Sequence, residues 1–394
     1  MRHGTPPALS SDPPGRIPAL DILRGLALAG MFVVHFHVRS TDPGGLDDFV
    51  RHVVWRGVEG KSHGTFALLF GAGFALQLAR AERRGVPFAG LYLRRLLVLA
   101  VFGFAAHALF GFNVLLGYAV WGVPLLAIGS WSTRALFITA VISSASVLLY
   151  RIAVDSLLMF AGGADAIASA ADAEMARAAA VNDALRSAFA QHEYGAQIQA
   201  RLAHMAWFYT QPFFVMPGPT LTLFIAGLLM VRHRVFENVR RHARALIWLS
   251  IFGVLSWITC NWILPGTSLF GIVRDQWLTF SYVCLALWVL ESRPSLTRLL
   301  DPIAAAGRMA LTNYLLQIAT LDLLFAGYAV GLGQIRPIAG LGAALLCFAA
   351  EVALSVWWLK RFRLGPAEWL WRSLTYGRLQ PMRRRAEPVP EALI

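Results

Sequence analysis

Residues 17–38 read IPALDILRGLALAGMFVVHFHV, an apolar run that is long enough to cross a bilayer as a helix. Ionisable side chains interrupt this run: Asp21 and Arg24 near its start and His35 near its end. Arg24 and His35 are separated by almost three helical turns, so both project from one face, roughly 16 Å apart along the axis. An ionisable residue inside a membrane is costly unless it faces protein or water, so this face is a candidate functional site.

The composition predicts an all-α polytopic membrane protein whose first partner is the lipid bilayer. Of the 394 residues, 57% are hydrophobic and only 14% are charged, whereas roughly a quarter of a soluble domain is charged. The net charge of +13 is spread over short basic clusters between apolar runs, as the positive-inside rule expects, so we expect no nucleic-acid partner. The three cysteines all lie in apolar runs without a CxxC pair, which argues against a disulfide framework or a zinc ribbon.

Apolar runs of spanning length recur about ten times. We place them near residues 17–38, 64–80, 93–110, 113–130, 135–153, 211–231, 243–264, 275–291, 308–329 and 337–358. Every even-numbered loop, and the tail, is more basic than its odd-numbered neighbours. The positive-inside rule therefore predicts ten transmembrane helices with both termini in the cytoplasm, in a multi-pass protein of the cell inner (plasma) membrane.

The longest loop divides the chain into two expected bundles. It is Ala-rich with spaced Asp, Glu and Arg, a composition that favours one or two amphipathic helices on the outer face. No small-residue cleavage site follows the first run, so we expect that run to be retained as a span. The expected organisation is a polar cytoplasmic tail (1–16), an N-terminal bundle (17–153), the extracytoplasmic loop (154–210), a C-terminal domain (211–380) and a basic then acidic tail (381–394).

His35 is the best candidate general base, because its ordinary pKa lies near neutrality. A base of this kind usually needs a partner that fixes its tautomer, and we expect Asp322, a buried carboxylate at a similar depth, to be that second catalytic residue. Two alternatives stay open. His35 could be an interfacial histidine solvated by lipid headgroups, and Asp322 could pair with an arginine instead.

Further polar residues fall at matching depths of other predicted spans and predict a polar core that crosses the membrane. Arg24 could clamp a phosphate or carboxylate with its planar fork, or it could form a structural ion pair with Asp21 or Glu351. The expected substrate-binding residues are Arg24, His107, Asn113, Asn313, Tyr314 and Gln317.

Two short sequence patterns, a pair of histidines and a pair of small residues, predict helix geometry rather than a metal or catalytic site. His35 and His37 face nearly opposite ways on a helix, so we expect no metal site there and no bound cofactor. Gly71 and Ala75 form a small-xxx-small pair that predicts close helix packing.

Four motifs in order resemble one family. RIPALDILRGLALAGMFVV (16–34), FALLFGAGFALQLARAERRG (66–85), GRMALTNYLLQ (307–317) and LGPAEWLWRSLTYG (364–377) resemble the YeiB-like membrane proteins. These proteins carry a C-terminal domain of unknown function, number 418. The resemblance covers nearly the whole chain and is weakest around residues 160–205.

The LDxxRG start of this family is in turn similar to a wider group of membrane acyltransferases. That group includes the acyltransferase-3 proteins, which acylate surface sugars, and the lysosomal heparan glucosaminide acetyltransferase. In acyltransferase-3 proteins a first-span Arg is followed by a His at the spacing of Arg24 and His35, whereas YeiB relatives commonly have Asn at the later position. The chain also has Asn113 where YeiB relatives usually carry Asp.

The resemblance implies a membrane acyltransferase. Acyl-CoA, as co-substrate, would approach from the cytoplasm, where Arg24 could meet its phosphates. His35 would deprotonate a hydroxyl or amine of a small-molecule or glycan acceptor near the outer face. The alternative is a transporter or permease for a small solute, whose intramembrane ionisable residues bind substrate or relay protons. A non-catalytic scaffold or sensor is the third possibility.

Overall fold

The protein is helical throughout the part of the chain that the computed structural model describes, which is residues 17–40, 44–259 and 268–383. These residues contain no β-strand, only two isolated bridges such as Ser40 with Ile335. The all-α prediction is therefore confirmed. The predicted tail 1–16, the last eleven residues and Cys260 lie outside the described residues.

Ten helical segments coincide with the runs expected to span the membrane. They are α1 (Pro18–His37), α3 (Lys61–Arg84), α4 (Ala89–Phe110), the pair α5 (Leu115–Gly122) and α6 (Pro124–Ile128), α7 (Thr133–Ala190), α10 (Gly218–Arg232), α11 (Val239–Ile258), α12 (Ser268–Ser292), α15 (Ala310–Phe325) and α16 (Pro337–Arg361). Among the described residues, five segments are long and apolar enough to cross a membrane: α1, Leu46–Arg84, α4, α7 and α16. The span count of ten stays a prediction.

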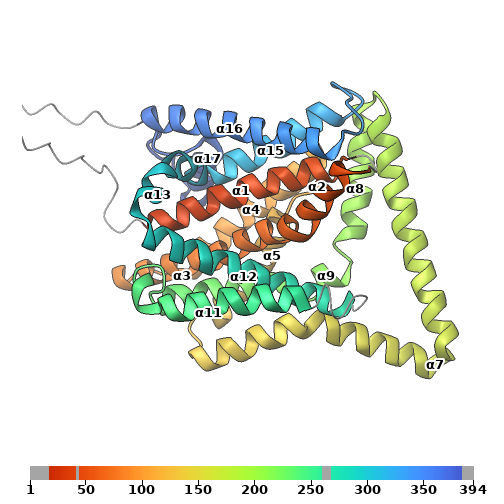
Figure 1. Cartoon of the computed structure of the whole chain (residues 1–394), viewed down its shortest axis with the longest axis horizontal. Helices are drawn as coiled ribbons and strands as arrows, with labels where there is room; N and C mark the ends of the chain where they lie inside the picture. Colours follow the sequence, from red (N-terminus) through yellow and green to blue (C-terminus); the bar gives the residue numbers. More distant parts are fainter. Residues whose placement is uncertain (1–16, 41–43, 260–267, 384–394) are drawn as a thin grey trace, which may run out of the picture.

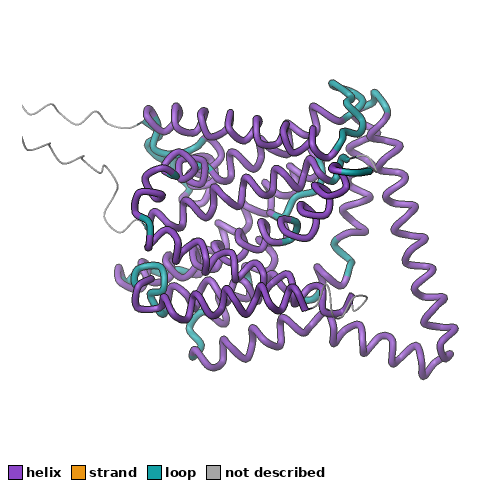
Figure 2. The backbone as a smooth tube through the Cα atoms, viewed as in Figure 1, coloured by secondary structure: helices purple, strands orange, loops and turns teal. Residues whose placement is uncertain are grey.

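Shorter elements close the two ends of the bundle. They are α2 (Leu46–Val53), the π-helix η1 (Val54–Val58), α8 (Tyr194–Phe208), α9 (Pro212–Val215), α13 (Pro294–Leu299), α14 (Asp301–Arg308) and α17 (Pro366–Tyr376). In Figure 1, α13 and α17 lie at the left end of the bundle, and α8 and α9 lie at the right. The loops gather at these two ends (Figure 2). We call the end with α13 and α17 the basic end, because the arginine-rich connections lie there.

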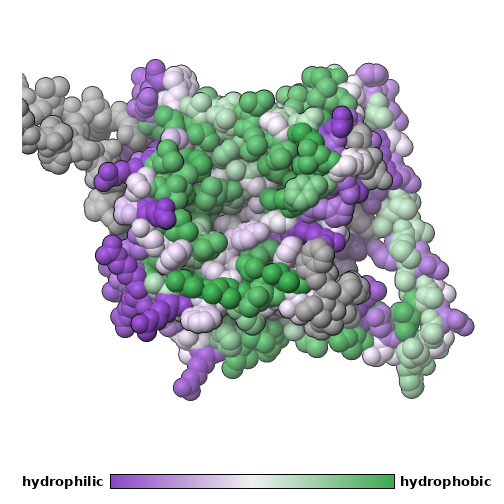
Figure 3. Space-filling view, viewed as in Figure 1, coloured by the Kyte–Doolittle hydropathy of each residue, from purple (hydrophilic) through white to green (hydrophobic). Residues whose placement is uncertain are grey.

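The surface has the layering that a bilayer requires. Figure 3 shows an apolar middle zone with hydrophilic side chains gathered toward the ends, most densely at the basic end. Side chains in the middle zone such as Leu97, Phe137 and Leu346 are more than half exposed, which suits contact with lipid. The cytoplasmic location of the basic end remains a prediction from the positive-inside rule.

Helix α7 shows how the longest loop of the chain is built. It continues as helix through the expected boundary at residue 153, and its backbone leaves helical geometry only at Gly162 and Gly163, where Gly163 has a φ of 69°. A positive φ favours glycine, so the Gly-Gly pair supplies the bend. The second arm of α7 then runs back to the right end of the bundle and connects to α8 (Figure 1). We call residues 164–208 the cap.

Small residues let helices from the two expected bundles pack together. A Cβ built on Gly71 of α3 would collide with the backbone carbonyl of Phe224 in α10, and one built on Gly227 of α10 would collide with that of Leu68. The close packing predicted at Gly71 is therefore confirmed. Helix α1 packs against α3, α14, α15 and α16, and Arg24 and His35 are both half-buried among these helices.

Candidate active site

His35 lies inside the bundle against a tyrosine. Its ring is 6.2 Å from the ring of Tyr314 in α15, measured between centroids. Its Nδ1 atom is buried and has no hydrogen-bond partner among the described residues. An interfacial histidine solvated by headgroups would expose this atom, so the buried position favours the functional interpretation.

Tyr314 joins His35 to two further tyrosines. Its hydroxyl accepts a hydrogen bond from the backbone N–H of Val114 at 3.1 Å, which holds the phenol at the start of α5. Tyr118 in α5 and Tyr209, which directly follows α8, lie close enough to interact electrostatically with it. Elements that are far apart in sequence therefore converge on Tyr314.

A second histidine, His107, is fully buried near the end of α4, and neither ring nitrogen has a hydrogen-bond partner among the described residues. Its ring is 5.9 Å from that of His204 in α8 and 6.3 Å from that of Tyr209. The Tyr209 hydroxyl is also buried without a partner in the described part of the chain. Phe112 and Phe208 pack around these groups. Buried polar groups without partners are rare in proteins and indicate a place where a ligand or water binds.

We call His35, His107, His204, Tyr209 and Tyr314 the histidine–tyrosine cluster. Burial lowers the pKa of His204, which lies in the cap, so its imidazole is neutral at physiological pH. A neutral imidazole can donate through one nitrogen and accept through the other. The cluster therefore offers hydrogen-bond donors, acceptors and a base without carrying a fixed charge.

The predicted partnership between His35 and Asp322 is wrong, and the arginine alternative holds. The carboxylate of Asp322 accepts hydrogen bonds from the guanidinium of Arg201 in the cap and, at 2.7 Å, from the hydroxyl of Tyr328. The side chains of Arg201 and Asp322 are 1% and 0% exposed. A buried carboxylate is stabilised most by a cation with several donors, and Arg201 supplies them. Asp322 thus fastens the cap to the bundle.

Three of the predicted site residues have structural partners. Asn113 donates to the carbonyl of Gly103 at 2.9 Å and accepts from the N–H of Leu115 at 3.1 Å, so it joins α4 to α5. Asn313 donates to the hydroxyl of Ser355 at 2.9 Å. Gln317 donates to the carboxyl of Glu351 at 2.9 Å. These contacts place Asn313 and Gln317 between α15 and α16 rather than in the histidine–tyrosine cluster.

Arg24 forms the structural ion pair with Asp21, at 3.1 Å, and not with Glu351. Its side chain remains 28% exposed. Arg24 also lies near Arg95, whose guanidinium stacks at 3.9 Å over the ring of Trp371. The two guanidinium groups are close and repel each other. A bound anion would relieve this repulsion, so the site suits an anionic ligand.

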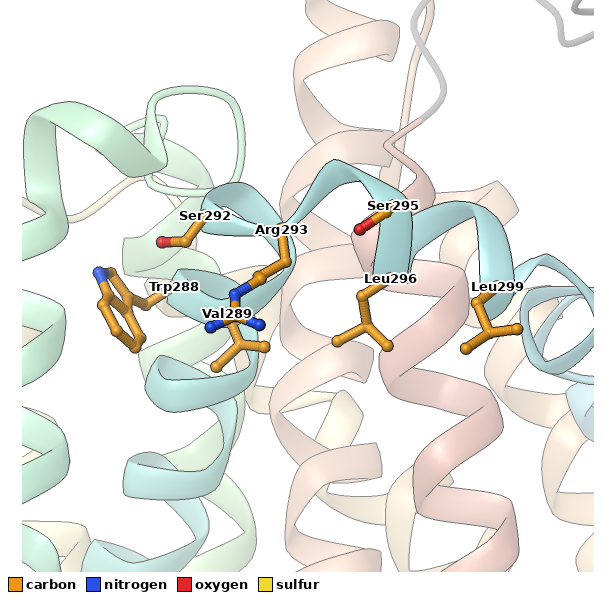
Figure 4. Close-up of a pocket in the computed structure, with 7 residues that line it drawn as sticks. All are labelled: Trp288, Val289, Ser292, Arg293, Ser295, Leu296 and Leu299. Carbon is orange, nitrogen blue, oxygen red and sulfur yellow. The ribbon is translucent and has the colours of Figure 1, made fainter.

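A separate pocket opens at the basic end, between the end of α12 and α13 (Figure 4). It has a volume of about 560 Å³. Its lining consists of Trp288, Val289, Ser292, Arg293, Ser295, Leu296 and Leu299. None of these is a predicted site residue. Arg293 is the one ionisable side chain in this lining, so the lining contains no pair of ionisable groups that could act together as acid and base.

The sequence did not reveal Arg201, His204 or Tyr209 as site residues. All three lie in the cap and its exit, in the segment RLAHMAWFY (201–209). The only signal in the sequence was the density of aromatic and basic residues in a segment otherwise expected to be an amphipathic surface helix. Which of them turns inward depends on the bend at Gly162 and Gly163.

Comparison with known proteins assigns the chain to a family. Residues 230–378 match the model of the family described as "Protein of unknown function (DUF418)". Residues 16–172 match the model described as "Heparan-alpha-glucosaminide N-acetyltransferase, catalytic". The chain is 30% identical to the uncharacterized protein YeiB of Escherichia coli (strain K12), over 79% of this chain and 80% of that one. The chain belongs to the YeiB family.

A second relative of this YeiB-family chain matches it over nearly the whole length of both proteins. The uncharacterized protein YxaH of Bacillus subtilis (strain 168) is 28% identical, over 94% of this chain and 97% of its own. No solved structure matches the chain. The acetyltransferase match relates this family to membrane acyltransferases, and the matched range contains Arg24, His35 and His107. The expected family resemblance is thereby confirmed.

Proposed function

We propose that this protein is a membrane acyltransferase that moves an acyl group from a cytoplasmic thioester, such as acyl-CoA, to a hydroxyl or amine acceptor at the outer face. The observation that carries the proposal is His35, whose Nδ1 is buried, has no partner among the described residues and lies on the Tyr314 side of α1. The match of residues 16–172 to an acetyltransferase catalytic domain supports the reaction class.

In the proposed reaction His35 acts as the general base. It takes the proton from the acceptor hydroxyl or amine, and the acceptor atom attacks the thioester carbonyl carbon. The carbon–sulfur bond breaks, and the leaving thiolate receives the proton from the imidazolium. The products are an acylated acceptor and a free thiol, and His35 returns to its starting state. The donor hydroxyl of Tyr314 is a candidate to stabilise negative charge on the carbonyl oxygen.

The two substrates would meet the protein at different depths. Arg24 and Arg95 are candidates to bind the phosphates of the donor, because bidentate guanidinium groups suit phosphate. His107, His204 and Tyr209 are candidates to bind the acceptor, because they offer uncharged hydrogen-bonding groups beside aromatic rings. The roughly 16 Å between Arg24 and His35 along α1 fits an extended pantetheine arm.

The test is acyl-CoA turnover by the purified protein in proteoliposomes, followed as thiol release. The variant His35→Ala should lower turnover by about 100-fold or more, the usual contribution of a general base. The matched control is His37→Ala, which removes an imidazole from the opposite face of the same helix.

Equal turnover in both variants would remove His35 from the mechanism. A transporter would behave differently from an enzyme in this assay: it would release no thiol with any acceptor and would instead carry solute across the vesicle wall.

A further inference from the structure

Two polar rungs join α15 to α16 in the middle of apolar helices. In the first, the amide of Asn313 donates to the hydroxyl of Ser355 at 2.9 Å. In the second, the amide Nε2 of Gln317 donates to Oε2 of Glu351 at 2.9 Å. All four residues are buried, and Glu351 is the most exposed of them at 5%. We call these two side-chain hydrogen bonds the polar ladder. It lies between α15 and α16, where its four residues are shielded from water.

Three oxygen atoms of the polar ladder accept no hydrogen bond from any described residue. Glu351 Oε1, Gln317 Oε1 and Asn313 Oδ1 are all buried and lack a hydrogen-bond partner among the described residues. A carboxylate and two amide oxygens offer only acceptors to one another, so they cannot satisfy themselves. An ionised carboxylate in an apolar interior needs a cation or several donors, and among the described residues Glu351 accepts from a single amide N–H, that of Gln317.

The charged groups of the surrounding elements do not compensate Glu351. No hydrogen bond or ion pair joins them to its carboxyl in the described part of the chain. The ionisable groups of the elements packed around it are Asp21, Arg24, His35 and His37 of α1, Asp47, Asp48, Arg51 and His52 of α2, Asp301 and Arg308 of α14, Tyr314 and Asp322 of α15, and Cys347, Lys360 and Arg361 of α16 itself. Several of these have other partners, as Arg24 has Asp21 and Asp322 has Arg201.

We propose that Glu351 and Gln317 form an intramembrane proton-binding site, in which one proton on Glu351 Oε1 is donated to Gln317 Oε1. The carboxylic acid and the amide then form a cyclic pair. The amide N–H donates to one carboxyl oxygen, as the structure has it, and the acid O–H donates back to the amide oxygen. This single proton removes the charge and satisfies two of the three orphaned oxygens at once.

The site borders the helices that carry His35 and Tyr314. Gln317 also donates, at 3.4 Å, to the carbonyl of Leu28, which lies two turns before His35 on α1. Tyr314, beside His35, lies one turn before Gln317 on α15. Loss of the proton would put a negative charge next to an amide oxygen on this seam, and repulsion would loosen the contact between α1, α15 and α16. Protonation of Glu351 thus couples pH to the packing around His35, whatever reaction His35 carries out.

Infrared difference spectroscopy of the full-length protein in lipid vesicles tests the site. At neutral pH, the spectrum of the wild type minus that of Glu351→Gln should contain the C=O band of a protonated carboxylic acid. The band should shift in heavy water and shift again in Gln317→Leu, which removes the amide partner. A carboxylate band in its place, or a band that Gln317→Leu leaves unmoved, would overturn the proposal.

Thermal unfolding gives a second readout. Unfolded Glu351 ionises in water while the folded residue keeps its proton, so the native state binds more protons and stability falls as pH rises. From about pH 4, where unfolded Glu ionises, up to the pKa of the folded residue, the melting temperature of the wild type should fall relative to that of Glu351→Gln. Parallel curves of melting temperature against pH for the wild type and Glu351→Gln would contradict the proposal. The same infrared band is expected in His35→Ala, so a protein without acyl transfer would still reveal the proton site.

Discussion

Arg201 in the cap and Asp322 in α15 form a fully buried ion pair, although 121 residues separate them in the chain. Arg201 also donates to Gln197 at 2.9 Å and to the carbonyl of Leu109, so its guanidinium is satisfied on three sides. This one side chain therefore connects the cap, α4 and α15. It also explains why Asp322 is not available to His35.

Breaking this pair from one side should destabilise the protein strongly. Arg201→Leu removes the cation that donates to this buried carboxylate, and we expect a loss of about 3–5 kcal/mol in the free energy of unfolding. The double variant Arg201→Leu/Asp322→Leu should recover part of that loss. Chemical unfolding in detergent measures both.

The matched control is Arg186→Leu, because the pair of Arg186 with Asp183 is exposed. Surface pairs contribute about 0–1 kcal/mol, so this variant should resemble the wild type. A double variant as unstable as Arg201→Leu alone would contradict the buried-charge explanation.

Gly71 and Gly73 make a matched pair for the packing of α3 on α10. Gly71→Ala puts a methyl group into the backbone of Phe224, and we expect a loss of about 1–3 kcal/mol or a protein that does not fold. Gly73→Ala meets nothing nearer than the amide nitrogen of Gln77 at 3.9 Å, and it should be neutral or stabilising by up to about 1 kcal/mol. The melting temperatures of the two variants, compared with that of the wild type, test this packing. Equal melting temperatures for Gly71→Ala and the wild type would contradict the close contact of Gly71 with α10.

His107 should show a conflict between stability and activity. Because both ring nitrogens are buried without a partner among the described residues, His107→Phe removes an unsatisfied polar group. We expect the melting temperature to stay constant or rise while acyl-CoA turnover with an acceptor falls. A clear drop in melting temperature would mean that the imidazole is held by bonds to ordered water, and that its role is structural.

The contacts of Asp47 should make the stability of the protein sensitive to acid. Its carboxylate accepts from the backbone N–H of Ile338 at 2.9 Å and from Arg336 Nε at 2.8 Å, so α2 caps the start of α16. The Ile338 N–H and the Arg336 guanidinium hold the pKa of Asp47 below its ordinary value. A carboxyl whose folded pKa is depressed stabilises the protein above its unfolded pKa, and it loses that contribution as pH falls.

The melting temperature of Asp47→Asn should therefore lie below that of the wild type at neutral pH, with the gap closing below about pH 4. Asp48→Asn is the control, because the partners of Asp48 among the described residues, Arg51 and His52, belong to its own exposed helix turn. A gap that does not change with pH would exclude the charge of Asp47 as the cause.

Much of the architecture was predictable because hydrophobic length and periodicity act locally. The run 17–38 became α1 almost residue for residue, and Gly71 proved to be a packing position as its spacing indicated. Helix α7 was mispredicted in length because a helix can continue past the bilayer when no breaker intervenes, and the first breaker after residue 133 is the Gly162–Gly163 pair.

The candidate site was predictable only in part. The sequence indicated His35, His107 and Tyr314 because ionisable and polar groups stand out in apolar runs, and the structure brings them to neighbouring positions. It gave Asp322 the wrong partner, because the choice between His35 and an arginine depends on the position of the cap. Asn113 and Gln317 were taken as binding residues, but their amides are engaged by the backbone of α4 and α5 and by Glu351.

The amino-acid sequence by itself determined the helical class, the apolar spans, the basic loops and the placement of Arg24 and His35 on one face of α1. These properties follow from residue type and spacing along a single helix. Only the tertiary structure decided that Arg201 neutralises Asp322, that His204 and Tyr209 join His107, and that Glu351 meets Gln317 with no cation beside it in the described part of the chain. Such pairings join residues that lie far apart in the chain, so they are fixed by the packing of helices and by the need of each buried charge for a partner.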